Sequence, residues 1–342
     1  MDNIKNKILT RNGYLLLKNQ LSLKEITFIE KNLTVKPQSH PDYTVDIKPY
    51  EIFLKDRDYY YIPRYFAIKH FGSPLSMNEL YFKHNEENIS SVIHPFSFDG
   101  QLREKQLNIA NICIDSILKI GGGVITLPCG AGKTVISIYI SHVLRKLESM
   151  KNMKVLVIVH KTFLQNQWIN RIKQFTNARI GIIRQKKTDV KNKDIIVGML
   201  QSIAMIDYDP AIFNNIGLVI VDECHHIGSK VFSQALFKIG AQYTIGLSAT
   251  PYRNDGMSKV IFWHLGEIIY KEFRKTDNKV IVKIFNYEST DKLFAEKTQW
   301  INGKTKPSNP KMITNICKIQ SRNTFCIDII NNLRIQPGRK IL

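Results

Sequence analysis

The segment Leu127–Thr134 has the residue types and spacing of a loop that binds phosphate groups. It reads LPCGAGKT and follows a short apolar run. Gly130 and Gly132 allow a close backbone approach to oxygen atoms, and the successive N–H groups at the start of the next helix can cradle phosphates. In such a loop Lys133 reaches the β- and γ-phosphates and the Thr134 hydroxyl ligates Mg²⁺. The first position is leucine where the strict pattern has glycine. The predicted nucleotide-binding residues here are Cys129, Gly130, Ala131, Gly132, Lys133 and Thr134.

A second segment, Leu218–Glu223, reads LVIVDE and places two carboxylates at the end of an apolar run. Ligands of parallel sheets bind at the carboxyl ends of the strands, so both acids are expected at the same edge as the phosphate loop. Asp222 would hold Mg²⁺, directly or through water, and Glu223 would orient and deprotonate an attacking water. The plain alternative is a strand end with two solvated acids. The contiguous C-H-H that follows lacks the spacing of a metal site, and a polar relay from His225 toward Ser248 or Thr250 is favoured.

Short apolar strands alternate with amphipathic helices from about residue 100 onward. Val155–Val159 (VLVIV) is typical of a strand covered on both faces. Thr162–Phe175 places its apolar residues three and four positions apart, as a helix with one buried face does. The alternation predicts βαβ crossovers and an α/β fold. The predicted fold class is therefore α/β, a parallel sheet with helices on both faces, preceded by a small α+β domain.

The composition is that of a globular protein, with 44% hydrophobic residues and a net charge of +20. Residues 1–90 carry 13 Lys and Arg against 11 Asp and Glu, residues 91–270 carry 21 against 12, and residues 271–342 carry 15 against 6. The basic charge therefore lies on the middle and end of the chain, where a phosphate backbone is the natural partner; solvated surface lysines are the alternative. Three domains are predicted. Residues 1–90 form a small α+β domain, residues 91–272 form the α/β domain with the phosphate loop, and residues 273–342 form a linker with the truncated start of a further domain.

These segments together resemble the motifs of superfamily 2 helicases. DECH at 222–225 resembles motif II, and SATP at 248–251 resembles motif III, which couples the nucleotide state to the grip on nucleic acid. LREKQ at 102–106 resembles the adenine-reading motif, with Gln106 in place to pair with adenine, although Glu104 and Lys105 replace the more usual proline and aromatic. The resemblance implies that 91–272 is a RecA-like ATP-binding domain, with helices on both faces of its parallel sheet, and that 273–342 includes the truncated start of a second RecA-like domain. It also implies ATP and Mg²⁺ as cofactors, with coupling through His225, Ser248 and Thr250.

Two further segments resemble the family's backbone-gripping motifs. His160, Lys161 and Thr162 directly follow the strand VLVIV, and Gln201 and Ser202 lie in GMLQS. The resemblance implies contacts from these residues to the phosphates and sugars of DNA or RNA, without a preference between the two.

The sequence is most similar to the XPB-like branch of superfamily 2. LPCGAGKT, DECHH and LSATPYRNDG are similar to that branch's motifs, and LTVKP at 33–37 with YIPRYF at 61–66 looks like the transcription-associated helicases of large cytoplasmic DNA viruses, the poxvirus termination-helicase type. The resemblance implies an ATP-dependent helicase or translocase of viral-type transcription or replication, with transcription machinery as a partner. Motifs IV to VI do not occur in the sequence, so we expect a fragment of a longer helicase that hydrolyses ATP weakly alone.

Other readings remain open at this level. The chain could be a nucleic-acid-binding ATPase or duplex sensor without unwinding activity, or a binding module in which ATP alters nothing. Tyr59, Tyr60, Tyr61 and Tyr65 could stack on bases, although filling a small core is the favoured role. The five scattered cysteines form no C-x-x-C pair, and no apolar run is long enough for a membrane helix. We therefore expect an intracellular monomer that makes no membrane contact, in a virion or host cytoplasm if it is viral.

Overall fold

The computed structural model describes residues 8–38, 48–74, 96–150, 152–272, 283–301 and 304–335. Residues 1–274 form one compact unit and residues 275–342 form a second. Each unit is described by itself. The first unit contains every residue expected to take part in nucleotide or nucleic-acid chemistry.

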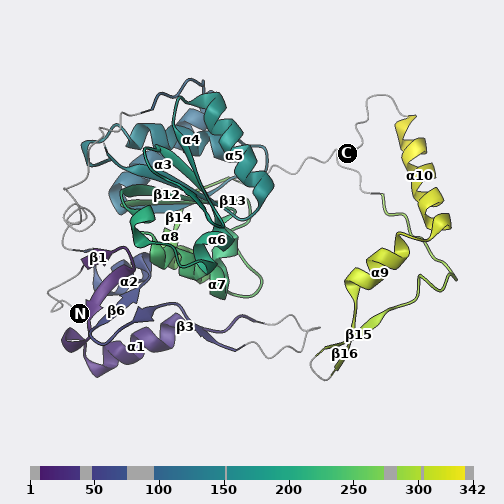
Figure 1. Ribbon diagram of the computed structural model, residues 1–342, viewed down its shortest axis with the longest axis horizontal. Coiled ribbons are helices and arrows are strands. Elements are labelled where there is room, and N and C mark those ends of the chain that lie inside the picture. Colours follow the sequence, from purple (N-terminus) through teal and green to yellow (C-terminus); the bar gives the residue numbers. More distant parts are fainter. Residues whose placement is uncertain are drawn as a thin grey trace. The chain divides into compact units, whose positions relative to one another are not determined.

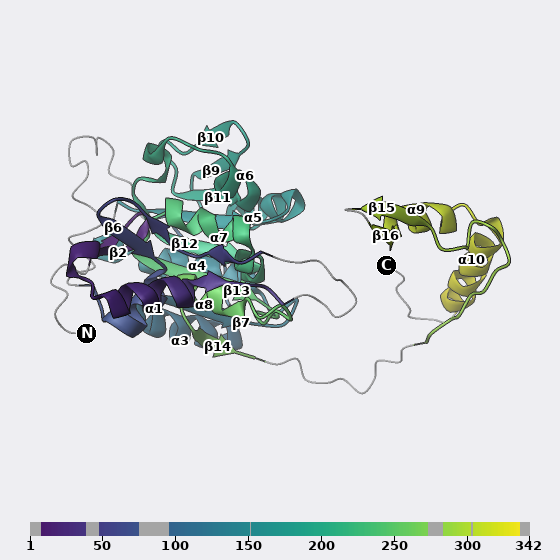
Figure 2. The ribbon, with the colours of Figure 1, turned by 90° about the horizontal axis from the view of Figure 1, so that it is seen from below.

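An eight-stranded sheet forms the centre of the first unit, with the strand order β10-β9-β11-β8-β12-β13-β7-β14. Figure 2 shows the strands following one another from β10 at one edge to β14 at the other. Neighbouring strands are parallel, except that β10 pairs with β9 in the antiparallel sense. The strands are β7 (Gly122–Thr126), β8 (Lys154–Val159), β9 (Ile180–Arg184), β10 (Lys187–Asp189), β11 (Ile195–Met199), β12 (Ile216–Asp222), β13 (Tyr243–Ser248) and β14 (Ile268–Lys271).

Helices cover both faces of this sheet, and Figure 1 shows α3, α4 and α5 on one side with α6, α7 and α8 on the other. Successive residues of β8 supply the two cores in turn: Val155 and Val157 pack in the first, and Leu156 packs in the second. A strand buried on both faces reads as a continuous apolar run, which confirms the predicted fold class. The helices are α3 (Glu104–Ile120), α4 (Lys133–Leu144), α5 (Thr162–Phe175), α6 (Leu200–Met205), α7 (Lys230–Ser233) and α8 (Ser258–Leu265), with short 3₁₀ turns η3 (Glu148–Met150), η4 (Pro210–Phe213), η5 (Cys224–Gly228) and η6 (Gln234–Lys238).

The N-terminal part of the first unit forms a four-stranded antiparallel sheet of order β1-β2-β6-β5. Ser22 and Glu25 form a capping box that begins its first helix. The aromatic-rich sequence 58–66 predicts a strand interrupted by Pro63. The structure has β6 up to Ile62, directly before this proline, which cannot donate to a ladder. Beyond it the prediction is wrong, because Pro63 is the N-cap of a helix that begins at Arg64. The elements are β1 (Ile8–Thr10), β2 (Gly13–Leu17), η1 (Lys18–Gln20), α1 (Leu23–Leu33), β3 (Thr34–Val35), β4 (Tyr50–Glu51), β5 (Leu54–Lys55), β6 (Tyr59–Ile62) and α2 (Arg64–Phe71).

This N-terminal part packs directly on the large sheet through buried polar contacts. The Arg64 guanidinium donates to the carbonyl oxygens of Ala241 and Gln242 at 3.3 and 2.8 Å. The tyrosines of the segment serve the fold, since Tyr60 is buried and donates to Glu30, and the Tyr65 hydroxyl lies 3.1 Å from the Thr244 hydroxyl. Of the two roles open for these tyrosines, the geometry of Tyr60 and Tyr65 supports core packing.

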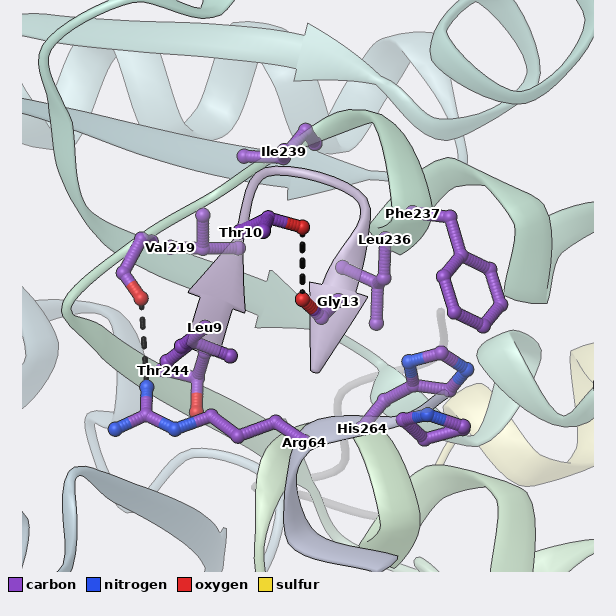
Figure 3. A pocket seen from close by; sticks show the side chains of 12 residues that line it. Leu9, Thr10, Gly13, Arg64, Val219, Leu236, Phe237, Ile239, Thr244 and His264 are labelled. Atoms are coloured by element: carbon purple, nitrogen blue, oxygen red, sulfur yellow. Dashed lines mark hydrogen bonds between the residues drawn. The ribbon is translucent and has the colours of Figure 1, made fainter. Parts of the chain in front are cut away.

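A small cavity of about 40 Å³ lies where the two sheets meet. Figure 3 shows residues of β1 and β2, together with Arg64, facing residues of the large domain across it. His264 of α8 lines this cavity and is 7% exposed, and its Nε2 has no hydrogen-bond partner among the described residues. Burial lowers the pKa of His264 to about 3, so the ring is neutral at the junction of the two sheets.

The second unit contains a two-stranded ribbon and two helices: β15 (Thr298–Ile301), β16 (Lys304–Pro307), α9 (Asn309–Ile316) and α10 (Gln320–Arg334). The polar composition of 304–310 predicts a loop, which is wrong for its first four residues because they form β16 and pair with β15. The sequence 279–285 predicts a strand, but its described part, 283–285, is not in one. The sequences 84–91 and 339–342 predict a linker and the opening of a strand, and both lie outside the described residues.

Candidate nucleotide-binding site

Five strands that are neighbours in the sheet end at the same edge. Each of them either ends in a predicted site residue or leads directly into a predicted site segment. In spatial order β11 leads to Gln201, β8 to His160, β12 ends at Asp222, β13 ends at Ser248, and β7 leads to the 127–134 loop. All five are parallel, so these ends share one edge. The phosphate loop and Asp222 are not on neighbouring strands, because β13 lies between them. With strands ~4.8 Å apart, β12 and β7 are about 10 Å apart.

The loop before α4 has the backbone shape that phosphate binding requires. Gly130 and Gly132 have φ angles of +81° and +94°, in the left-handed region that side chains disfavour. A Cβ on Gly130 would meet no heavy atom within 4 Å, so the loop is open at this point. Lys133 lies in the first turn of α4, and its Nζ donates to the Leu127 carbonyl oxygen at 3.0 Å, which holds the ammonium group over the loop. Thr134 follows it in the same turn.

Gln106 joins helix α3 to the phosphate loop. Its amide nitrogen donates to the Ala131 carbonyl oxygen at 3.1 Å, and its amide oxygen accepts from the backbone N–H of Arg103 at 3.1 Å. A Cβ on Gly132 would lie 2.3 Å from this amide nitrogen, so glycine is needed there for the approach as well as for the angle. The side chain lies in an open cleft of about 710 Å³, lined by Arg103, Lys105, Gln106, Ile109, Pro128, Cys129, Gly130, Ala131 and Glu272.

Both oxygens of the Asp222 carboxylate have donors within the protein. Oδ1 accepts the backbone N–H of Glu223 at 3.0 Å, and Oδ2 accepts the indole N–H of Trp168 at 2.8 Å. Trp168 belongs to α5 and is 1% exposed. A carboxylate has about four lone-pair sites, so each oxygen keeps capacity for a further partner such as a metal ion. Sequence reasoning missed Trp168, because its helical spacing indicates only a core residue.

Glu223 occupies a strained backbone position directly after β12. Its φ and ψ are 49° and 52°, the left-handed region, which is uncommon for a glutamate. Strain of this kind costs about 1–3 kcal/mol and concentrates at functional sites. Among the described residues, the other non-glycine residues with positive φ are Gln185, Asn192 and Asn215, all in turns. The bend places Oε2 of Glu223 3.4 Å from Nδ1 of His225.

A chain of polar contacts leads from Glu223 to the end of β13. His225 Nδ1 lies 3.2 Å from the Ser248 hydroxyl oxygen, and this oxygen also accepts the backbone N–H of Thr250 at 3.1 Å. The relay expected from His225 thus has Ser248 as its direct contact, and Thr250 joins through its backbone. Arg253, which sequence reasoning missed, donates to the His225 carbonyl oxygen at 2.7 Å and pairs with Asp255.

Three histidine rings lie close together beside this chain of contacts, each tilted relative to the next. The rings of His160 and His226 have centroids 3.9 Å apart, and those of His226 and His225 are 4.3 Å apart. Burial, with His160 as the next cause, lowers the pKa of His226 to about 4. Burial also lowers the pKa of His160, with Lys161 as the next cause. These two rings are therefore neutral near pH 7 and can pack closely.

The residues expected to grip a polynucleotide are placed unequally. Gln201 donates to the His160 carbonyl oxygen at 2.7 Å, which joins the two segments, and Lys161 is exposed with its Nζ 5.9 Å from the Phe163 ring centroid. Thr162 begins α5 and is exposed. Ser202 differs from the expectation: it is 7% exposed, and its hydroxyl accepts the backbone N–H of Gln185. That buried position does not suit a direct contact with nucleic acid.

The family comparison agrees with the motifs at this edge. Residues 99–253 match the family described as the res subunit of type III restriction enzymes. The chain is 36% identical over 349 residues to "Putative ATP-dependent RNA helicase L396" of Acanthamoeba polyphaga mimivirus, with 100% of this chain and 63% of that protein covered. It is 31% identical to "DNA 3'-5' translocase XPB2" of Sulfurisphaera tokodaii, with 55% of this chain and 40% of that protein covered.

Among solved structures, the chain is similar to the UvsW helicase from bacteriophage T4, with a TM-score of 0.49, 17% identity, and 73% of this chain and 94% of that chain covered. The resemblance of the chain to superfamily 2 helicases, to their XPB-like branch and to viral helicases is confirmed. It spans less than two thirds of the two relatives named above. No helix among the described residues is long and apolar enough to cross a membrane.

Proposed function

We propose that the protein containing this chain is an ATP-dependent motor on nucleic acid, and that residues 91–272 form its first ATP-binding domain. The observation that supports this proposal is the shared edge of five strands, where the phosphate loop, Ser248, Asp222, His160 and Gln201 lie in spatial order. ATP would bind at one side of this edge and a polynucleotide at the other. The residues between the two sites would then couple ATP hydrolysis to polynucleotide binding.

The nucleotide side accounts for hydrolysis residue by residue. Lys133 would bind the β- and γ-phosphates, and the open Gly130 leaves room for them. Asp222 and the Thr134 hydroxyl offer the hard oxygen ligands that Mg²⁺ prefers, and the free lone pairs of Asp222 fit that ion. Bound Mg²⁺ would neutralise charge that develops on the phosphates. Glu223 would then orient the attacking water and accept its proton.

The polynucleotide side uses the segments that follow β8 and β11. Lys161 is exposed beside the aromatic ring of Phe163, which is 62% exposed, so a backbone phosphate and a neighbouring base could be contacted together. Gln201 ties the two segments through the His160 carbonyl. The closely packed rings of His160, His226 and His225 join this region to Ser248 and Glu223, which would make ATP turnover respond to the grip. Binding should be largely independent of sequence and weakened by salt.

The test is the ATPase rate of the complete protein with and without DNA or RNA, in the natural protein and in Glu223→Gln. Removing the base should lower the stimulated rate by about 10²–10⁴-fold while ATP and nucleic acid still bind. Lys133→Ala is the companion variant, which should lose nucleotide binding itself. Equal stimulated rates in the natural protein and Glu223→Gln would refute the proposed role of the site.

Translocation without strand separation is a second candidate, favoured by the 31% identity to a protein named as a DNA translocase. Displacement of a third strand from a triplex measures movement along a duplex, whereas release of one strand from a forked duplex measures unwinding. Triplex displacement with no fork unwinding would establish the translocase. Transcription or replication as the process, and the transcription machinery as a partner, remain part of the same proposal.

A further inference from the structure

We propose that Trp168 is a positioning residue that holds the Asp222 carboxylate in the orientation needed to bind Mg²⁺. This inference rests on the proposed function, because it concerns the same metal–nucleotide site. It assigns a role to a side chain that is otherwise a buried member of the core beneath α5. The role depends on a single N–H group, the indole Nε1, which lies 2.8 Å from Oδ2 of Asp222.

Two hydrogen bonds, one to each oxygen, fix the plane of the Asp222 carboxylate. Oδ1 accepts the backbone N–H of Glu223, the next residue in the chain, and Oδ2 accepts the indole N–H of Trp168, which belongs to helix α5. With only the backbone bond, the carboxylate could turn about its side-chain torsion. The second donor removes that freedom and leaves lone pairs on both oxygens for a metal ion. Donors behind a metal-binding group orient it, and losing one typically costs 10–100-fold in metal affinity.

The indole is itself held in place. Trp168 is 1% exposed within the core between α5 and the sheet. One turn earlier on α5, Gln165 is 2% exposed and donates to the Val197 carbonyl oxygen of β11 at 2.9 Å. The helix is therefore fixed to one strand by Gln165 and to the end of another by Trp168. A tryptophan that only packs in the core would not need an acceptor at the carboxyl end of a strand. Trp168 donates its N–H to Asp222, the predicted metal ligand.

The first experiment measures the Mg²⁺ dependence of nucleotide binding rather than turnover. A fluorescent N-methylanthraniloyl-ADP is titrated into the protein at increasing Mg²⁺ and, separately, in EDTA. Trp168→Phe should need about 10–100-fold more Mg²⁺ for half-maximal tightening of binding, with binding in EDTA unchanged. Trp263→Phe is the matched control: it removes an indole that packs on Phe66, away from the site, and should behave as the natural protein.

A second measurement remains valid if Trp168→Phe does not fold. In the double variant Trp263→Phe, Trp300→Phe, Trp168 is the sole tryptophan of the chain. Because its N–H is bonded to Asp222, adding Mg²⁺ to the ADP complex should change the Trp168 emission. The same addition should leave the emission unchanged once Asp222→Asn is introduced.

The outcomes separate this inference from the proposed function. A natural protein that does not bind Mg²⁺–nucleotide would defeat the proposed function itself. If the natural protein binds it and Trp168→Phe shows the same Mg²⁺ dependence, the positioning role is refuted. Unchanged Trp168 emission while Mg²⁺ demonstrably tightens binding in the same sample would refute it equally.

Discussion

Acidic pH should weaken the attachment of the N-terminal sheet to the large sheet through one residue, His264. The ring lines the cavity where the two sheets meet, packs edge-on against Phe237 at 5.0 Å between centroids, and its Nε2 lacks a hydrogen-bond partner among the described residues. Burial lowers its pKa to about 3 in the folded protein, against about 6.5 in the unfolded chain. Between these two values the unfolded chain binds more protons, so stability is present above pH 6.5 and falls as the pH is lowered.

The size of the effect follows from these two pKa values. Linkage gives a loss of about 2 kcal/mol in the free energy of unfolding between pH 7 and pH 5, from this residue alone. Replacing the ring by a side chain of similar volume that does not titrate, in His264→Leu, should remove that share of the pH dependence. Other titrating groups act in both proteins, so the difference between their pH profiles isolates His264.

The assay is urea unfolding at pH 8, 7 and 5, followed by tryptophan fluorescence, to which Trp263 contributes. The Trp263 indole packs edge-on against the Phe66 ring at a centroid distance of 5.4 Å, so its emission reports on the junction of the sheets. The change in stability between pH 8 and pH 7 should be similar in the natural protein and His264→Leu, because over this range the histidine is neutral in the folded protein and mostly neutral in the unfolded chain. Profiles that stay parallel down to pH 5 would contradict the reasoning, since the ring would then titrate equally in folded and unfolded protein.

Three further predictions concern the strand-end site. Because the Gln106 amide is expected to pair with adenine, Gln106→Ala should weaken ATP binding by roughly 10–100-fold and leave GTP binding unchanged in equilibrium titrations. Equal weakening for both nucleotides would show that Gln106 only supports the loop. Ser248→Ala removes the oxygen that contacts His225 and Thr250. In the ATPase assay the variant should keep the basal rate, and its stimulation by nucleic acid should fall roughly tenfold, which corresponds to a coupling energy of ~1.4 kcal/mol. Retained stimulation would exclude this coupling role. Phe163→Ala should weaken the binding of single-stranded nucleic acid, measured by fluorescence anisotropy, by about 1–3 kcal/mol. Leu23→Ala, which removes an exposed apolar side chain of α1, is the control and should leave this affinity unchanged. Equal affinities of Phe163→Ala and the natural protein would exclude stacking by Phe163.

The parts of the fold that could be predicted from sequence are those in which one local pattern has one structural solution. A five-residue β-branched and apolar run such as 155–159 is buried on both faces wherever it occurs in a parallel sheet, and its two cores were implied by that fact. The GAGKT segment needs positive φ at its glycines, which Gly130 and Gly132 both show. Because the phosphate loop and the acidic pair both follow strands of a parallel sheet, the predicted site residues lie at one edge of that sheet.

The order of the strands across the sheet was not contained in those patterns. The phosphate loop and Asp222 are separated by β13, and no local signal in 122–126 or 216–222 says which strand lies between them. The intervening strand ends at Ser248, the residue that contacts His225, so Ser248 lies between the nucleotide loop and the acidic pair. Under the proposed function, this position suits a residue that couples the two sides.

Side chains whose role depends on a partner far along the chain were also missed. Trp168 fits a helical apolar stripe, and periodicity assigns such a residue to the core whether or not its N–H has an acceptor. Its partner Asp222 is 54 positions away, so only the packing of α5 on the sheet brings the two together. An indole differs from other large apolar side chains by one donor, and a buried indole usually finds a partner for it. In this fold that partner is the predicted metal ligand, so one α5 side chain serves both the core and the predicted metal site.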